Sequence, residues 1–272
     1  MNQPETPQKL FAIADTQSAR DERDLPIDRV GIKGLRYPLS FVDRDGVPQP
    51  TIAICNVYVG LPADRKGTHM SRLVALLEAR SDPSQPPLSV ENFRVLVEEL
   101  LELLEAPGGR LEVAFPMFIR KAAPVSGIVS RLDYEARIVG EITGGRYRQE
   151  VVVAVPVTSL CPCSKEISEY GAHNQRSLVT ITALATTPIW LTEMIRVAEE
   201  EASCELYGLL KRADEKYVTE RAYENPRFVE DLVRGVAARL RADARLEGFA
   251  VEAENYESIH NHSAYARIGR GL

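Results

Sequence analysis

The sequence predicts an α+β protein built from two similar modules, each with the order strand, strand, helix, helix, strand, strand. Apolar and polar residues alternate in the predicted strands, as in Leu132 to Ile138, which leaves one face wet and favours antiparallel sheets. Apolar residues recur at three- and four-residue steps in the predicted helices. The order of elements repeats after Gly144-Gly145. We therefore expect antiparallel sheets, each backed by helices on one face, with modules over 28–144 and 145–272.

The first module follows an N-terminal segment, residues 1–27, that is polar, contains proline and lacks an apolar period. We expect this segment to be a loosely ordered arm. The turn residues Asp45-Gly46 separate the first two strands, and Pro107-Gly108-Gly109 ends the second helix. The expected strands are 28–37, 51–59, 111–119 and 128–142, and the expected helices begin after Met70 and at Ser89.

The second module repeats this order. The expected strands are 147–157, 178–185, 245–254 and 263–268, and the expected helices begin at Thr192 and after Asn225-Pro226. A short echo accompanies the repeat, because residues 67–72 and 171–176 share Gly, His and Arg at the same spacing. Both observations indicate a duplicated module.

Composition excludes several classes of protein. The chain has 272 residues, 33 Lys and Arg against 39 Asp and Glu, and a net charge of −6. It contains no basic block of the kind that nucleic-acid binding needs and no apolar run near the ~18 residues that span a membrane. Four cysteines are too few for a disulfide scaffold, so reduced thiols and a cytoplasmic location are expected.

Candidate metal ligands lie where a predicted strand ends. Cys161 follows the strand and His173 lies in the polar loop after it, and a thiolate with an imidazole is a donor pair typical of catalytic zinc. A carboxylate is the expected third donor, from Asp214, Glu215 or Glu220 in a polar stretch between two helices.

Candidate proton-transfer residues lie between the last two strands. His260 and His262 are two residues apart, so in an extended segment their side chains point to the same side, and Glu257 precedes them. Imidazoles titrate near neutral pH, so this group is suited to donating and accepting protons.

Six segments together resemble GTP cyclohydrolase of type IB. They are residues 156–168, 170–176 and 258–263, together with 67–72, 216–220 and 225–230, so the resemblance covers almost everything after the arm. It implies the tunnelling fold and a homotetramer around a central channel, with sites at subunit interfaces. It also implies hydrolytic opening of GTP at C8 to give 7,8-dihydroneopterin triphosphate and formate, the first step of tetrahydrofolate biosynthesis.

The resemblance also implies roles for single residues. Cys161, His173 and Glu215 would hold a divalent ion, namely zinc, manganese or another, which makes water a usable nucleophile at neutral pH. The carboxylate of Glu230 would accept two hydrogen bonds from guanine. The catalytic candidates are Cys161, Glu257, His260 and His262, and the candidates for binding the triphosphate are Lys165, Arg176, His69 and Arg72.

The remaining thiols divide into two groups. Cys163 would lie beside the metal ligands or form a reversible disulfide with Cys161, whereas Cys55 and Cys204 are expected to be packing residues.

Two alternatives to the cyclohydrolase follow from the same residues. In a nitrile reductase of the same fold, Cys161 would be a covalent nucleophile and NADPH would replace the metal. In a non-catalytic purine-binding or zinc-stabilised scaffold, Cys161 would support the fold only.

Overall fold

The structure is a computed structural model that describes residue 17 and residues 19–272. Its first half holds β1 (Ile27–Phe41), β2 (Gln49–Leu61), α1 (Met70–Ser81), α2 (Phe93–Leu104), β3 (Gly109–Ala122) and β4 (Val129–Thr143). Its second half holds β5 (Arg146–Leu160), α3 (Pro162–Ile167), β6 (Asn174–Ala185), α4 (Leu191–Glu201), β7 (Cys204–Glu205), α5 (Arg212–Glu224), α6 (Val229–Ala242), β8 (Leu246–Asn255) and β9 (Ala264–Arg270). The main strands and helices predicted from the sequence are all present, and the α+β class is confirmed.

All the described strands belong to one antiparallel sheet rather than two. The strand order is β1-β2-β3-β4-β5-β6-β8-β9, with β7 paired to β5. β4 pairs with β5 from Glu135↔Ala154 to Thr143↔Arg146, so the two modules share a continuous ladder. The two residues between these strands, Gly144 and Gly145, have φ values of +57° and +75°, which glycine adopts without steric cost and which suit a two-residue hairpin. A tight turn, not a linker, therefore connects the modules.

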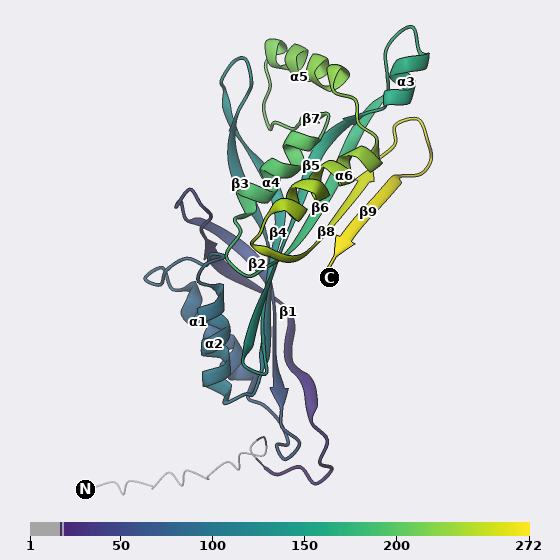
Figure 1. The fold of residues 1–272 in the computed structure, drawn as a ribbon. Helices are drawn as coiled ribbons and strands as arrows, with labels where there is room; N and C mark the ends of the chain where they lie inside the picture. The colour runs from purple at the N-terminus through teal and green to yellow at the C-terminus, as the bar shows by residue number, and fades with distance from the viewer. Residues whose placement is uncertain (1–16, 18) are drawn as a thin grey trace, which may run out of the picture.

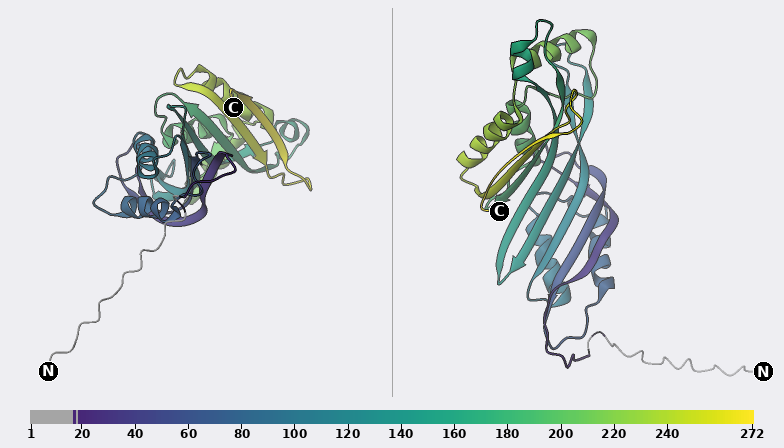
Figure 2. Two further views of the ribbon diagram at one scale, coloured as in Figure 1. Left: turned by 90° about the horizontal axis from the view of Figure 1, so that it is seen from below. Right: turned by 90° about the vertical axis from the view of Figure 1, so that its right-hand side faces the viewer.

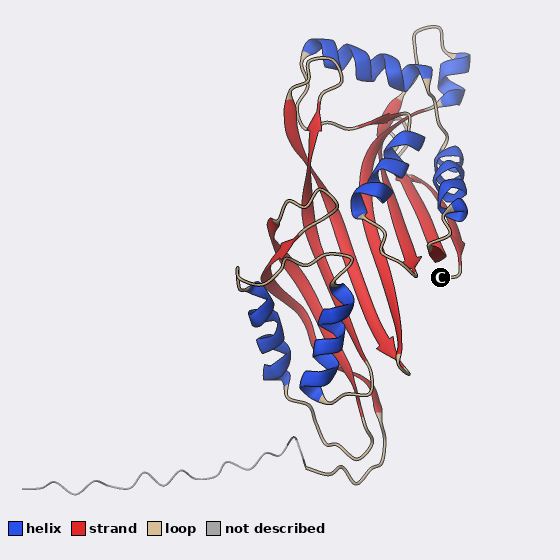
Figure 3. Ribbon diagram, turned by 60° about the vertical axis from the view of Figure 1, so that its left-hand side comes forward, coloured by secondary structure: helices blue, strands red, loops and turns tan. Residues whose placement is uncertain are grey.

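The helices cover one face of the sheet in two groups. α1 and α2 pack on strands of the first half, and α4 and α6 pack on β5, β8 and β9, as Figures 1 and 3 show. Side chains on this face form a single hydrophobic core that runs through both halves, from Leu39 to Ala253. Alternate residues of β5 illustrate the pattern, since Val151, Val153, Val155 and Val157 are all fully buried. The long strands run the length of this layer (Figure 2).

Two helices and a short strand in the second half have no counterpart in the first. α3 directly follows Cys161, and β7 and α5 lie between α4 and α6. The stretch containing Asp214, Glu215 and Glu220, for which the sequence predicts only a polar segment between two helices, is the helix α5. Its low proportion of apolar residues explains why the sequence pattern did not reveal it.

The sequence echo does not mark equivalent positions. His69 lies between β2 and α1, whereas His173 lies between β5 and β6. The repeat is therefore one of element order, and the three shared residues are not part of it.

The predicted arm over residues 1–27 lies mostly outside the described residues. In its described part, the backbone N–H of Asp21 donates to the carbonyl oxygen of Asp64, and that of Lys66 donates to the carbonyl oxygen of Ala19. β1 then begins at Ile27. Among the described residues, no helix is long and apolar enough to cross a membrane.

Candidate functional site

The ends of β5 and β6 bring Cys161 and His173 side by side. The ladder between these strands ends at Leu160↔Asn174, and the next backbone contact is the N–H of Cys161 donating to the carbonyl oxygen of His173 at 3.1 Å. Ser164 joins the pair, because its hydroxyl donates to the carbonyl of Cys161 and accepts the N–H of His173, both at 3.2 Å. Three hydrogen bonds therefore fix the backbone of both residues.

The side chain of Cys161 begins helix α3. Its sulfur accepts the backbone N–H of Ser164 at 3.4 Å, as a capping group does, and Pro162 occupies the first helical position, where no N–H is needed. The thiol is half-buried. It is thus held just beyond the end of β5 and is partly accessible to solvent.

The imidazole of His173 is oriented by neighbouring polar groups. Its Nδ1 lies 3.0 Å from Oε1 of the buried Gln175, 3.5 Å from the Ser258 hydroxyl and 3.9 Å from Oε2 of Glu257. A hydrogen bond at one ring nitrogen fixes the tautomer and leaves the other nitrogen as a potential ligand. Sequence reasoning did not identify Ser164 or Gln175, because their importance depends on which residues the strands bring beside His173.

Cys161, His173, Gln175 and Glu257 line a cavity of about 300 Å³. It is bounded by the ends of β5, β6 and β8, the start of α6 and the segment before β9. Of the candidate site residues predicted from the sequence, it brings together Cys161, His173, Glu230, Glu257, His260 and His262.

His260 and His262 lie close together on the wall before β9. Their rings stack with centroids 5.2 Å apart and an interplanar angle of 17°. Both are exposed, whereas the Glu257 side chain is only 11% exposed. Two solvent-accessible imidazoles and a sheltered carboxylate therefore face the same cavity.

Two further residues of this cavity were not singled out from the sequence. Nε of Arg227 and Oδ1 of Asn255 are buried and have no hydrogen-bond partner among the described residues. Buried polar atoms are almost always paired, because an unpaired one loses its hydrogen bonds to water without replacement. Their lack of partners indicates that this wall is built to contact a polar ligand.

The donor set fits a divalent metal in chemistry, but not as a complete site within one described chain. Cys161 and His173 are adjacent, and Gln175 supports the imidazole in the way that outer residues support metal-bound histidines. Glu215, however, lies exposed on α5 and does not line the cavity. Over residues 17 and 19–272, no three His, Cys, Asp or Glu side chains form a group that could hold an ion.

Asp214, one of the three acids considered as a ligand, has a structural role instead. It is fully buried and accepts hydrogen bonds from the backbone N–H groups of Val125, Ser126 and Lys211 and from the Ser126 hydroxyl. Burial alone would raise the pKa of Asp214, but these hydrogen bonds outweigh it and hold the pKa below its usual range. The carboxylate thus ties the start of α5 to the β3–β4 hairpin.

α5 nevertheless packs beside the candidate ligands. Val218 and Ala222 lie on one face of this helix and contact Leu160 and Ala172, the residues that precede Cys161 and His173. Glu215 is one turn before Val218 on the same face.

Lys165 and Arg176 do not line the cavity. Nζ of Lys165 donates to the carbonyl oxygen of Tyr223 at 2.5 Å and lies 4.4 Å from the centroid of its ring, so it joins α3 to the end of α5. Arg176 is exposed on β6 and alternates with the buried Gln175 and Ser177, which places it on the opposite face of the sheet.

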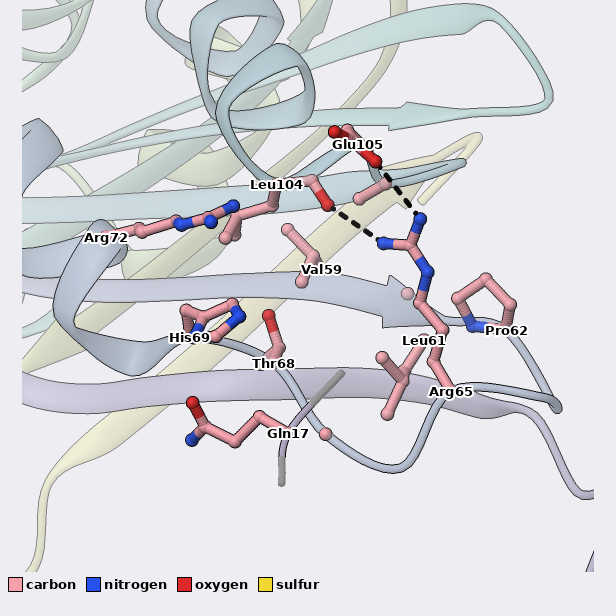
Figure 4. Close-up of a pocket in the computed structure, with 13 residues that line it drawn as sticks. Gln17, Val59, Leu61, Pro62, Arg65, Thr68, His69, Arg72, Leu104 and Glu105 are labelled. Carbon is pink, nitrogen blue, oxygen red and sulfur yellow. Dashed lines mark hydrogen bonds and ion pairs between the residues drawn. The ribbon is translucent and has the colours of Figure 1, made fainter. Parts of the chain in front are cut away.

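His69 and Arg72 line a second cavity of about 280 Å³ at the start of α1 (Figure 4). Arg65 and Thr68 also line it, and the guanidinium groups of Arg65 and Arg72 donate to carbonyl oxygens at the end of α2. This cavity adjoins Val59, which the ladder aligns with Tyr147 through β3 and β4. The stretch from Tyr147 to Cys161 along β5 spans roughly 45 Å at about 3.3 Å per residue. The two cavities therefore lie near opposite ends of β5.

The remaining thiols differ in exposure. Cys163 is exposed on α3, whereas Cys55 in β2 and Cys204 in β7 are buried. Burial raises the pKa of Cys55 to about 11 and also raises the pKa of Cys204. Both buried thiols are packing residues, as expected from the sequence.

Comparisons with known proteins agree on one family. A family model described as type I GTP cyclohydrolase folE2 matches residues 13–266. The chain is 59% identical over 260 residues to GTP cyclohydrolase FolE2 of Burkholderia multivorans, covering 96% of this chain and 95% of that protein. It is also 59% identical over 260 residues to the protein of the same name from Paraburkholderia xenovorans, covering 96% of each.

A solved structure supports the fold independently. The structure of a hyper-thermostable uricase mutant superposes with a TM-score of 0.51 at 12% identity, covering 90% of this chain and 93% of that one. At this identity the likeness concerns the fold alone, and it confirms the tunnelling fold that the sequence motifs implied.

Proposed function

Because the chain belongs to the type I GTP cyclohydrolase FolE2 family and is a GTP cyclohydrolase of folate biosynthesis, we propose that the cavity at the end of β5 is its active site. The reaction converts GTP and water into 7,8-dihydroneopterin triphosphate and formate. One observation carries the assignment of the site: a hydrogen-bonded Cys161–His173 pair opens onto the same cavity as Glu230 and the unpaired Arg227 and Asn255.

Cys161, His173 and Glu215 would hold a divalent metal, either zinc, manganese or another. When bound, such an ion supplies the Lewis acidity that makes water a nucleophile at neutral pH. The chain's own contribution is to fix the first two ligands through the Cys161–His173 backbone bond and to orient the imidazole through Gln175. The packing of α5 on Leu160 supports Glu215 as the third donor, since α5 carries it on the same face.

Glu230 would bind the guanine base. It lies in the first turn of α6 and lines the cavity, and its carboxylate can accept from both N1–H and the 2-amino group. A base without these donors would leave the carboxylate unpaired, so the contact would select guanine.

Glu257, His260 and His262 would transfer protons. Release of formate requires a proton at the departing ring nitrogen, and closure of the new ring requires removal of one from the attacking amine. The two exposed imidazoles and the sheltered carboxylate face the cavity, and Oε2 of Glu257 lies 3.9 Å from Nδ1 of His173.

The four candidates for the triphosphate would act from more than one subunit. His69 and Arg72 lie at the far end of the chain from Cys161, so they could serve this site only in a neighbouring copy. β1 and β9 are the terminal strands of the sheet in the described chain, and their free edges favour assembly. We therefore propose a homotetramer with sites at subunit interfaces, in which Lys165, Arg176, His69 and Arg72 contact the triphosphate.

A cytoplasmic location is part of this proposal. Its support is that all four cysteines are free thiols. The net charge of −6 likewise favours a small-molecule substrate over a nucleic acid.

Incubation of the purified protein with GTP and Mn²⁺, followed by oxidation of the product to a fluorescent pterin, tests the assignment. We expect pterin and formate in equal amounts, loss of both in Cys161→Ala, and retention in Cys163→Ala, whose thiol lies outside the cavity. Absence of both products with every divalent metal would overturn it.

The same preparations address the two alternatives. NADPH oxidation with a deazapurine nitrile would indicate the reductase. A Cys161→Ala protein that stays folded but is inactive would argue against a scaffold, because a scaffold thiol matters only for the fold.

A further inference from the structure

Arg227 is a cation inside the candidate active site without an acid partner. Its Nε is buried and unpaired, and no carboxylate of the described residues lies within ion-pair distance of its guanidinium. A buried charged donor left without an acceptor is costly, so such a group is retained where a ligand supplies the acceptor.

The backbone around Arg227 is held on both sides. Its own N–H donates to the carbonyl oxygen of Leu160 at 3.0 Å, directly before Cys161. The next N–H, that of Phe228, donates to the Asp231 carboxylate at 3.1 Å, which caps the start of α6. The guanidinium is therefore presented to the cavity from a fixed point between the candidate metal ligands and α6.

Arg227 lies three residues before Glu230, and both side chains line the same cavity. The edge of guanine that carries N1–H and the 2-amino group also carries the carbonyl oxygen on C6, next to N1. A carboxylate that accepts from the two N–H groups leaves this oxygen unpaired. A hydrogen-bond donor beside the carboxylate would pair with this remaining oxygen.

We propose that Arg227 is a specificity-determining residue that donates a hydrogen bond from its guanidinium to the C6 oxygen of guanine. The inference rests on the proposed function, since it assumes that Glu230 binds the same base. It also explains selection against adenine, because an amino group at C6 would place a donor against a donor.

Equilibrium binding to EDTA-treated protein tests this without turnover. Calorimetry would compare GTP, guanosine and 6-thio-GTP, whose sulfur is a weak acceptor, on the wild type and on Arg227→Met. Arg227→Gln keeps an N–H donor, and Arg227→Lys keeps the charge without the planar fork. Arg234→Met, which changes an exposed arginine of α6, is the matched control.

We expect Arg227→Met to weaken binding of GTP and guanosine by the same factor, about 10- to 100-fold. Its preference for GTP over 6-thio-GTP should fall toward one, Arg227→Gln should recover part of it, and Arg234→Met should match the wild type.

Three results would overturn the inference. The first is weaker binding of GTP with unchanged binding of guanosine, which would indicate a phosphate contact. The second is full recovery of binding in Arg227→Lys, which would indicate that charge alone matters. The third is unchanged binding of both ligands in Arg227→Met. Failure of the proposed function would give a different result. In that case the wild type would bind guanosine and depend on Arg227 for this binding, but it would form no pterin from GTP.

Discussion

The backbone N–H of Cys161 donates a hydrogen bond to the carbonyl oxygen of His173 at 3.1 Å. This bond continues the β5–β6 ladder by one position, so the sheet itself, rather than a bound ion, sets the separation of the two residues. If Cys161 and His173 are the first two metal ligands, as proposed, a site organised in this way would keep both in place when the metal is removed. The side chains around them then determine how tightly the metal is held.

Gln175→Leu should weaken metal binding. The substitution removes the acceptor 3.0 Å from His173 Nδ1 and so frees the imidazole to rotate. We expect the affinity for Mn²⁺ to fall about 10- to 100-fold, measured by competition with a chelating dye. Gln149→Leu, which removes another buried glutamine that donates to the Val90 carbonyl, should reduce stability and leave metal affinity unchanged. Equal metal affinity in Gln175→Leu and the wild type would contradict the role assigned to Gln175.

Glu230→Gln should reduce selectivity for guanine. The amide retains one acceptor oxygen but loses the charge, so kcat/KM for GTP should fall about 10- to 150-fold. Inosine triphosphate lacks the 2-amino group, and the wild type should use it poorly. Steady-state kinetics with both nucleotides should show this preference shrinking in the variant, and a preserved preference would place guanine recognition elsewhere.

A mixture of two inactive variants should recover activity if sites form between subunits. Cys161→Ala lacks a proposed metal ligand, and Arg72→Ala lacks a cation of the distant cavity. After subunit exchange, about a quarter of the sites in an equal mixture would combine a natural Cys161 with a natural Arg72 from another copy. Pterin formation measured before and after exchange provides the readout. If activity stays at the level of the unmixed variants, the two residues do not meet across an interface.

The four thiols should differ widely in alkylation rate. Cys163 is exposed on α3, whereas Cys204 is buried and burial raises the pKa of its thiol. Because the thiolate is the reacting form, iodoacetamide at pH 8 should modify Cys163 first and leave Cys204 intact in the folded protein. Peptide mass spectrometry over time checks the order, with protein unfolded in urea as the control in which all four react.

Stability should decrease in alkaline solution because of Cys55. Burial raises the pKa of this thiol from 9.0 to about 11, so the folded state retains a proton that the unfolded state releases. The free energy of unfolding therefore falls as pH rises from 9 toward 11, by up to about 2.7 kcal/mol for a shift of two pH units. Urea titrations of the wild type and Cys55→Val at each pH isolate the effect, since the variant lacks the titrating group. Parallel pH profiles would show that this thiol ionises alike in both states.

The periodic elements of the fold were predictable from the sequence. The valines of β5 alternate with partly exposed residues, and the apolar residues of α2 recur at helical steps, so local pattern and tertiary burial agree. Helix α5 was not predictable, because it is polar and its position depends on the hydrogen bonds of Asp214 and on the packing of Val218 and Ala222. The sequence also did not predict that the two expected sheets form one. This depends on the pairing of β4 with β5, and the sequence pattern does not reveal that these two strands form a hairpin.

The candidate site was predictable where motifs carry the chemistry. The residues that come together in one cavity are Cys161, His173, Glu230, Glu257, His260 and His262. Gln175 and Arg227 lie within such motifs, but no role was assigned to them or to Asn255, because a buried amide or guanidinium becomes informative only when its neighbours are known. The placement of His69 and Arg72 in a separate cavity follows from strand length, which sequence motifs do not encode.

The hairpin at Gly144-Gly145 has a consequence for how the chain unfolds. Because the ladder from Glu135 to Thr143 on β4 is completed only by β5, and because one hydrophobic core runs through both halves, neither repeat can lose its structure without exposing the other. We therefore expect a single cooperative transition rather than two. A fragment ending at residue 144 would carry an open strand edge that favours self-association over independent folding. The two halves are therefore mutually dependent, although the order of their main elements is the same.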